Sequence, residues 1–155
     1  MNNKALIIFV TLVCALLFFF INQMTPHPGQ TSGNGNPAIP FIVVLVLLFC
    51  YLVFLWFKVF DNVVVKRLHL IFIMVLIFIY WIIGLLYQKA SFIIYRNVLA
   101  NAHKEEYDII DWDYINQITS FMSIHVNNQY FNVNTYLISL TASIFTALLF
   151  KLPRA

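Results

Sequence analysis

Four long stretches without a charged residue constrain this 155-residue chain more than any other feature. Each holds 17 or 18 residues: Ala5–Ile21, Pro40–Phe57, Leu70–Tyr87 and Val133–Phe150. A helix of about 20 apolar residues crosses a hydrocarbon core of about 30 Å, and the working range begins at about 17. Because the bilayer core offers no water to bind the backbone, a single spanning segment is stable there as a helix. The sequence therefore predicts an all-α integral membrane protein with four transmembrane helices.

Composition agrees with this class and excludes others. The chain is 62% hydrophobic and 10% charged, whereas a soluble domain is about half apolar and about a quarter charged. The net charge of +3 is small and its lysines and arginines are scattered, so no basic patch suits nucleic acid. Cys14 and Cys50 both lie inside apolar stretches, and we interpret them as apolar core residues rather than as a disulfide or metal ligands.

The N-terminal stretch resembles a signal peptide only superficially. Lys4 precedes the apolar run Ala5–Ile21, but the run is longer than the usual signal core of about 7–15 residues, and no small-residue cleavage site follows it. We interpret it as an uncleaved first span.

The lysines and arginines in the short flanks predict the orientation of the spans, because cytoplasmic flanks carry an excess of them. One side holds six of the nine: Lys4, Lys58, Lys66, Arg67, Lys151 and Arg154. The opposite side holds three: Lys89, Arg96 and Lys104. We therefore predict a multi-pass protein of the cell membrane with both termini in the cytoplasm.

The chain is interpreted as one four-helix membrane domain, residues 1–155, with two outer segments of different character. The linker 22–39 is rich in proline and glycine, which favours a flexible loop. The segment 88–132 shows helical periodicity, with four residues on one face: Phe92, Tyr95, Leu99 and Ala102. The third span is therefore expected to continue outward as a helix to Ala102.

A second outer helix is predicted from Asp108 to about His125. Its apolar face consists of Ile110, Tyr114, Ile118 and Phe121. Asp108 suits the N-terminal cap and the helix dipole, while Thr119 is expected on the polar side. This helical extracytoplasmic segment is expected to form a small hairpin or to lie on the outer leaflet.

Acidic and histidine side chains in the outer segment suggest metal binding only weakly. Five carboxylates fall within nine residues: Glu105, Glu106, Asp108, Asp111 and Asp113. They lack the loop glycine and the alternation of a calcium-binding loop, so we interpret them as a solvated turn and a charged helix start. The trio His103, Glu106 and His125 does not define zinc geometry. We predict no metal site and no cofactor.

Catalytic signatures are absent from the sequence. It contains no glycine-rich phosphate loop, no Gly-x-Ser-x-Gly and no His-Glu-x-x-His. The spans also lack the ionisable residues that mark a proton or ion path. We assign no catalytic residue and expect a protein that is not an enzyme.

The fourth apolar stretch differs from the others in its small residues. Thr135, Ser139, Ser143 and Ala147 recur every four residues, and Ala142 and Thr146 flank them. Small residues let two helix backbones approach closely in lipid. This face is expected to pack within the chain's own bundle or to meet a partner or a second copy. The second stretch is uniformly bulky, which favours a helix that faces lipid.

Two classes of function remain open at this point. The leading hypothesis is a non-enzymatic accessory, regulatory or immunity-type factor that binds another membrane or envelope protein. The alternative is a small oligomeric transporter or channel, whose path would be lined by Asn134, Thr135, Ser139 and Ser143. The expected partners are the lipid bilayer and either a membrane protein or a second copy of the chain.

Overall fold

The computed structural model describes residues 3–30 and 35–154. Its four long helices are α1 (Asn3–Gln23), α2 (Ile39–Asp61), α3 (Arg67–Tyr107) and α6 (Val133–Lys151). The shorter helices are α4 (Trp112–Ile118), η1 (Ile124–Val126), α5 (Asn127–Tyr130) and η2 (Leu152–Arg154). No strand occurs among the described residues. All four long helices are long and apolar enough to cross a membrane, which confirms the prediction of an all-helical fold with four such helices.

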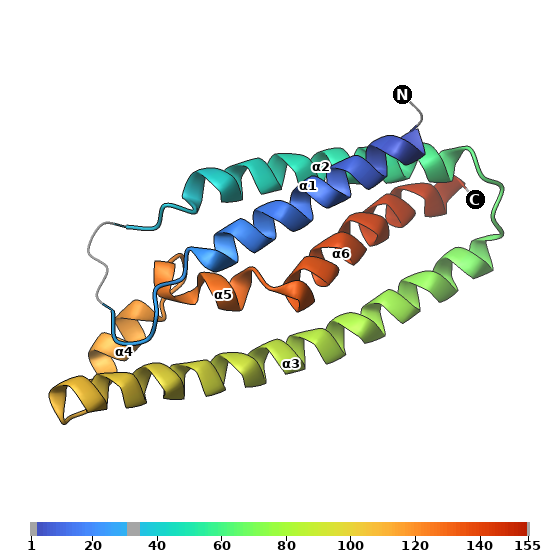
Figure 1. Ribbon diagram of the computed structural model, residues 1–155. Coiled ribbons are helices and arrows are strands. Elements are labelled where there is room, and N and C mark those ends of the chain that lie inside the picture. The colour runs from blue at the N-terminus through green and yellow to red at the C-terminus, as the bar shows by residue number, and fades with distance from the viewer. Residues whose placement is uncertain (1–2, 31–34, 155) are drawn as a thin grey trace.

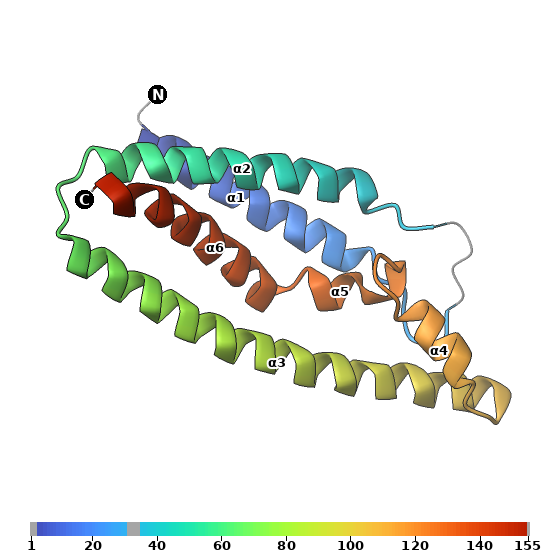
Figure 2. The same ribbon diagram turned by 180° about the vertical axis from the view of Figure 1, so that it is seen from behind.

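The long helices form a bundle in which α6 contacts each of the other three. It packs most extensively against α2, then against α3, and only lightly against α1. α1 and α2 pack directly on each other and share a buried core: Ile7, Val10, Cys14, Leu45, Leu52 and Leu55. The start of α1 and the end of α6 lie at the same end of the bundle in both views (Figure 1, Figure 2).

The second apolar stretch is buried along one side and exposed along the other, and that its exposed side faces lipid stays a prediction. α2 packs against both α1 and α6. Leu45, Leu52 and Leu55 are therefore buried along one side of the helix. α3 is the least covered of the four long helices. Cys50 departs from its predicted place in the core, since it is exposed on α2.

The third helix continues well past its apolar stretch. The prediction that it extends to Ala102 is confirmed, and it runs five residues further, to Tyr107. Its 41 residues correspond to a length of about 60 Å at about 1.5 Å per residue. Asp108 ends this helix in the left-handed conformation, with a φ of 61°, and donates its backbone N–H to Lys104 O. An aspartate tolerates this conformation better than most residues.

The predicted helix from Asp108 to about His125 is wrong in its extent. α4 covers only seven residues, and its N-cap is Asp111 rather than Asp108. Asp111 Oδ1 accepts hydrogen bonds from the backbone N–H groups of Asp113 and Tyr114, at 2.9 and 3.0 Å. After α4 the backbone turns, and Met122 has a φ of 68°, which no α-helix contains.

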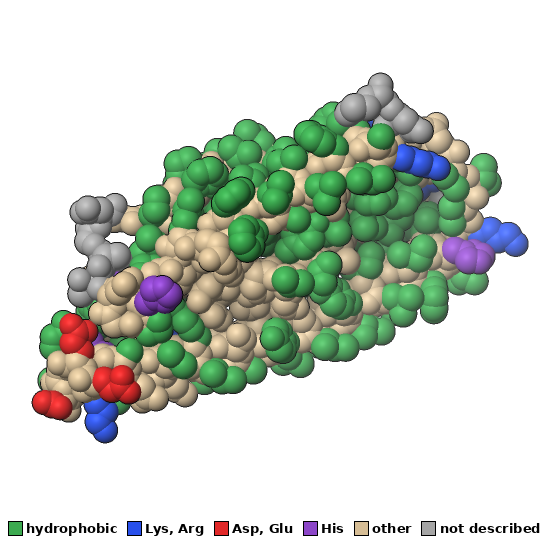
Figure 3. All heavy atoms as spheres, in the orientation of Figure 1, with side chains coloured by type: hydrophobic (Ala, Val, Ile, Leu, Met, Phe, Trp, Pro, Cys, Tyr) green, Lys and Arg blue, Asp and Glu red, His purple; other side chains and the backbone are tan. Residues whose placement is uncertain are grey.

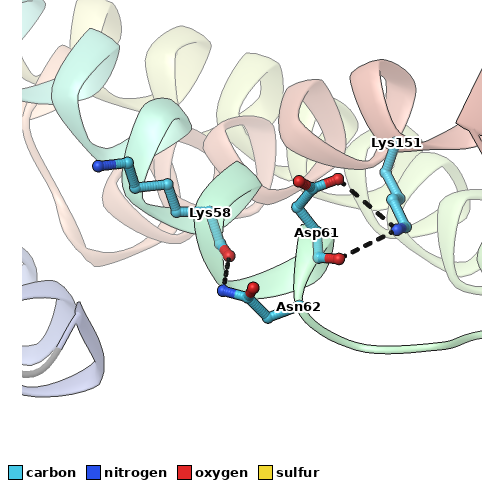
Figure 4. Close-up of polar contacts among 4 residues, drawn as sticks. All are labelled: Lys58, Asp61, Asn62 and Lys151. Carbon is cyan, nitrogen blue, oxygen red and sulfur yellow. Dashed lines mark hydrogen bonds and ion pairs between the residues drawn. The ribbon is translucent and has the colours of Figure 1, made fainter.

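Charged side chains gather at the two ends of the bundle. On the face in Figure 3, acidic side chains lie at the end that carries α4, and most basic ones lie at the opposite end. At that opposite end Lys151, which is buried, holds α6 to α2 (Figure 4). Its Nζ lies 3.8 Å from the Asp61 carboxylate and donates to the Asp61 carbonyl at 3.5 Å. On the same face in Figure 3, hydrophobic side chains are spread over the surface between the two ends.

Candidate functional site

A layer of uncharged amides lies where three apolar stretches end. We call it the amide layer, and it consists of Asn22, Gln88, Asn132 and Asn134. Asn22 follows the apolar stretch of α1, Gln88 follows that of α3, and Asn132 precedes that of α6. Asn22 Nδ2 donates to Phe131 O at 2.8 Å, which holds the end of α1 to the start of α6. An amide both donates and accepts, so this layer joins helices without a charge.

The same layer fixes α3 against α6. Asn134 Nδ2 donates to Gly84 O at 2.9 Å and to Gln88 Oε1 at 3.2 Å. Gln88 Nε2 donates to Gln129 O at 2.6 Å, and its Oε1 also accepts from Asn132 Nδ2 at 3.2 Å. Gly84 permits this approach, because a Cβ there would lie 3.1 Å from Asn134 Oδ1.

Residues 88–132 form a folded unit that begins and ends at the amide layer, and we call this unit the cap. Its small core is made of Leu99 and Ala100 from α3 and Ile115 from α4. Four half-buried side chains surround this core: Tyr95, Ile110, Tyr114 and Ile118. The Tyr95 hydroxyl donates to His125 O at 2.8 Å. The cap therefore depends on the outer half of α3 for its core.

Two predictions about individual side chains of the cap are corrected. Phe121, expected on the apolar face, is 74% exposed because it lies outside the helix. Thr119, expected on the polar face, is buried, and its hydroxyl donates to Ile115 O at 2.7 Å. The predicted face holds for Ile110, Tyr114 and Ile118, which pack on the cap core.

The linker between α1 and α2 is held to the cap by a pair of buried asparagines. Asn36 Nδ2 donates to Asn127 Oδ1 at 2.8 Å, and Asn127 Nδ2 donates back to Asn36 Oδ1 at 3.1 Å. Asn36 also donates to Met122 O at 3.0 Å and accepts from the Ala38 backbone N–H at 2.9 Å. The described parts of the linker are thus anchored near Asn36. Residues 31–34, which the flexible-loop prediction also covers, lie outside the described residues.

The histidine and glutamate trio lines one small pocket, but its side chains are not grouped as metal ligands. His103, Glu106 and His125 line one pocket of about 20 Å³. His103 Nδ1 is already 2.9 Å from Ile109 O, and burial lowers the pKa of His125, which favours its neutral form. Within residues 3–30 and 35–154, no three His, Cys, Asp or Glu side chains are grouped to hold a metal ion.

The small-residue face of α6 lies partly inside the bundle. Ser143 and Ala147 are fully buried, while the other four are partly exposed: Thr135, Ser139, Ala142 and Thr146. Thr135 forms a capping box with Asn132 at the start of α6. The role of this face in binding a partner stays a prediction.

Three hydroxyl groups of the small-residue face donate to backbone carbonyls within or just before α6. Ser143 Oγ donates to Leu140 O at 2.7 Å, and Thr146 Oγ1 donates to Ala142 O at 2.8 Å. Thr135 Oγ1 donates to Asn132 O at 3.0 Å. These hydroxyls therefore use their protons locally, and they contribute no donor to a continuous polar path between the helices.

An exposed apolar face along α3 is a feature that the sequence reasoning missed. Its members are spaced by seven, four, three, four and four residues, and we call them the α3 ridge: Leu76, Ile83, Tyr87, Ala90, Ile94 and Val98. All six are exposed, and Ile94 is 65% exposed. The signal was present in the sequence, because the apolar period continues past Gln88. The same apolar period also predicts folding of the outer segment, so the sequence alone does not single out an exposed face.

No family model, no curated protein and no solved structure matches this chain. The functional argument therefore rests on the helices, the amide layer, the cap and the α3 ridge.

Proposed function

We propose that this chain is a multi-pass protein of the cell membrane, with both termini in the cytoplasm and the cap outside. In this proposal it is a non-enzymatic accessory, regulatory or immunity-type factor. It acts by binding another membrane protein along the α3 ridge.

The distribution of polar groups supports this orientation. The amide layer lies at the ends of apolar stretches, where uncharged polar side chains meet the polar boundary of a bilayer. Five of the six acidic residues belong to the cap, and six of the nine lysines and arginines belong to the opposite flanks. Cytoplasmic flanks carry such an excess of positive charge.

The observation that carries the binding proposal is the continuation of the α3 ridge past the amide layer. Ile94 and Val98 lie six and ten residues beyond Gln88, or about 9 and 15 Å along the helix. Apolar side chains that face water in a row mark a surface that meets a partner. Inside the bilayer the same face of α3 would meet lipid or the partner's helix.

The shape of the ridge indicates the kind of partner. Spacings of three, four and seven residues keep the ridge on one side of α3, which suits packing against another helix along its length. The ridge itself carries no charge, so its complement is an apolar helix face rather than an acidic or basic segment. The proposed partner is therefore a membrane protein with a spanning helix that continues outward beside α3.

The transporter or channel alternative has no comparable support. Three of its four proposed path residues already donate hydrogen bonds inside the chain: Asn134 to Gly84 O, Thr135 to Asn132 O and Ser143 to Leu140 O. A polar path through lipid needs groups that are free to replace water around a solute.

Photocrosslinking from two adjacent isoleucines tests the proposal. A photoreactive amino acid replaces Ile94 on the ridge, and in a matched control it replaces Ile93, which is 51% exposed and points about 100° away. We expect position 94 to crosslink one distinct membrane protein in native membranes and position 93 to crosslink little. Equal crosslinking from both positions, or crosslinks from position 94 to a second copy of the chain only, would contradict the proposal.

A further inference from the structure

A groove between α1 and the start of α6 has the form of a binding site. Its volume is about 540 Å³, within the range of about 300–1,000 Å³ that is typical of small-molecule sites. Ala15, Phe18, Phe19 and Tyr136 contribute apolar walls. The groove exists because α1 and α6 contact each other only lightly, although both pack closely on α2.

The polar residues of the groove are gathered at one end. Asn22 and Gln23 lie at the end of α1, and Asn132 lies just before α6. These amides belong to the level at which the apolar stretches end, while Ala15 lies almost two turns deeper in α1. The groove is therefore polar at the expected membrane boundary and apolar toward the membrane interior, which matches the head and tail of a lipid.

A second, mainly apolar cavity lies behind the groove, between α1, α2 and α6. It has a volume of about 230 Å³ and shares three lining residues with the groove: Phe18, Phe131 and Tyr136. The Phe18 ring packs edge-on against Phe131 at 5.3 Å and against Tyr136 at 5.4 Å between ring centres. These three rings form the wall between the two spaces. A mainly apolar lining of this kind suits apolar ligands.

We propose that this groove binds a single-chain lipid with an uncharged, hydrogen-bonding head, such as a monoacylglycerol. The tail lies along Ala15, Phe19 and the aromatic wall, and the head meets the amides at the rim. This inference rests on the membrane insertion in the proposed function, but not on the partner of the α3 ridge.

No charged side chain lines the groove among the described residues, and this favours an uncharged head over a phosphate. A phosphate is bound by arginine, lysine or several backbone N–H groups, and none of the rim side chains supplies a positive charge. Amide side chains instead offer donors and acceptors that match hydroxyl and ester groups.

Photolabelling in nanodiscs of phosphatidylcholine tests the inference with the full chain. One probe is a monoacylglycerol with a 16-carbon tail that carries a diazirine near its end, and the comparison probe is a phosphatidylcholine with the same tail. We expect the glyceride probe to label the groove, at Ala15 or Phe19, at least five-fold more than the phosphatidylcholine probe does. Equal labelling of the groove by both probes would overturn the inference, because the groove would then hold bulk lipid.

Two variants of α1 provide the matched comparison. Ala15→Trp fills the groove, whereas Leu16→Trp adds the same ring at a neighbouring residue that is exposed and does not line the groove. We expect Ala15→Trp to lose groove labelling and Leu16→Trp to keep it. Labelling that is the same in both variants would overturn the inference.

A charge change at the rim tests the selection of the head without filling the groove. Gln23 is exposed at the end of α1, so Gln23→Lys is compatible with the fold. We expect this variant to shift groove labelling toward a phosphatidic acid probe, by several-fold relative to the glyceride. An unchanged ratio of phosphatidic acid labelling to glyceride labelling would contradict the idea that the rim side chains select the lipid head. Labelling of outward residues such as Leu12 by phosphatidylcholine, without labelling of the groove by the glyceride, would overturn this inference and leave the proposed membrane insertion standing.

Discussion

The buried pair Asn36 and Asn127 makes a quantitative prediction about how the linker holds the cap. Asn127→Ala removes the two reciprocal hydrogen bonds, whereas Asn36→Ala removes these and the bonds to Met122 O and the Ala38 N–H. At about 1 kcal/mol net per hydrogen bond, the losses are about 2 kcal/mol for Asn127→Ala and about 4 kcal/mol for Asn36→Ala.

The double variant separates the pair interaction from the rest. The same four bonds are lost in Asn36→Ala and in the double variant, so the double variant should lose about 4 kcal/mol rather than the sum of about 6 kcal/mol. The predicted coupling between the two residues is therefore about 2 kcal/mol, as expected for groups in direct contact.

Hydrogen exchange of the cap peptide 121–131 measures these differences. A loss of about 2 kcal/mol speeds local opening about 30-fold, and about 4 kcal/mol speeds it by about three orders of magnitude. Asn101→Ala, an exposed residue of α3, is the control and should leave exchange unchanged. Additive effects of the two substitutions, or exchange like the wild type in Asn36→Ala, would refute the reasoning.

Three further predictions concern packing and pH. Ser143→Leu inserts a bulky side chain at a fully buried residue, and thermal unfolding in detergent should show a loss of stability of about 1–3 kcal/mol. The control Val43→Leu changes a residue that is 56% exposed, and it should unfold like the wild type. Gly84→Val should separate α3 from α6, because even a Cβ lies 3.1 Å from Ile138 Cδ1; faster hydrogen exchange in both helices would show it, and unchanged exchange would contradict it. Burial lowers the pKa of His125, so the unfolded chain binds its proton more readily, and stability should fall as pH drops below about 6.5. His125→Gln should flatten this fall between pH 7 and pH 5, and an identical pH profile in both proteins would count against it.

Some parts of the fold follow from the sequence because they depend on length and composition. Each of the four uncharged stretches lies within one long helix. The extension of α3 was also predictable, since Tyr95 and Leu99 keep the helical period beyond Gln88 and pack on the cap. In these cases a local pattern is enough to determine the structure.

The end of the cap helix depends on contacts that a local pattern does not contain. The apolar period predicted a helix through Phe121, but the chain turns at Met122, whose carbonyl is held by Asn36 from the linker 86 residues earlier. Asp108 and Asp111 are both plausible caps by residue type. The left-handed backbone of Asp108 places it after α3, and Asp111 therefore starts α4.

The candidate surfaces were predictable only in part for a similar reason. The small residues of α6 are visible in the sequence, yet which of them are buried depends on the positions of α2 and α3. Ser143 and Ala147 are buried, whereas Ser139 lines the inner cavity. The groove between α1 and α6 could not be predicted, because it arises where two helices remain apart.

Cysteine labelling in intact cells tests the proposed arrangement in the membrane most directly. After Cys14 and Cys50 are replaced, single cysteines are introduced at Val64, between α2 and α3, and at Ser120, in the cap; both residues are exposed. We expect a membrane-impermeant maleimide to label Ser120→Cys in intact cells and Val64→Cys only after permeabilisation. Labelling of Val64→Cys in intact cells, with Ser120→Cys protected until permeabilisation, would contradict the proposed orientation.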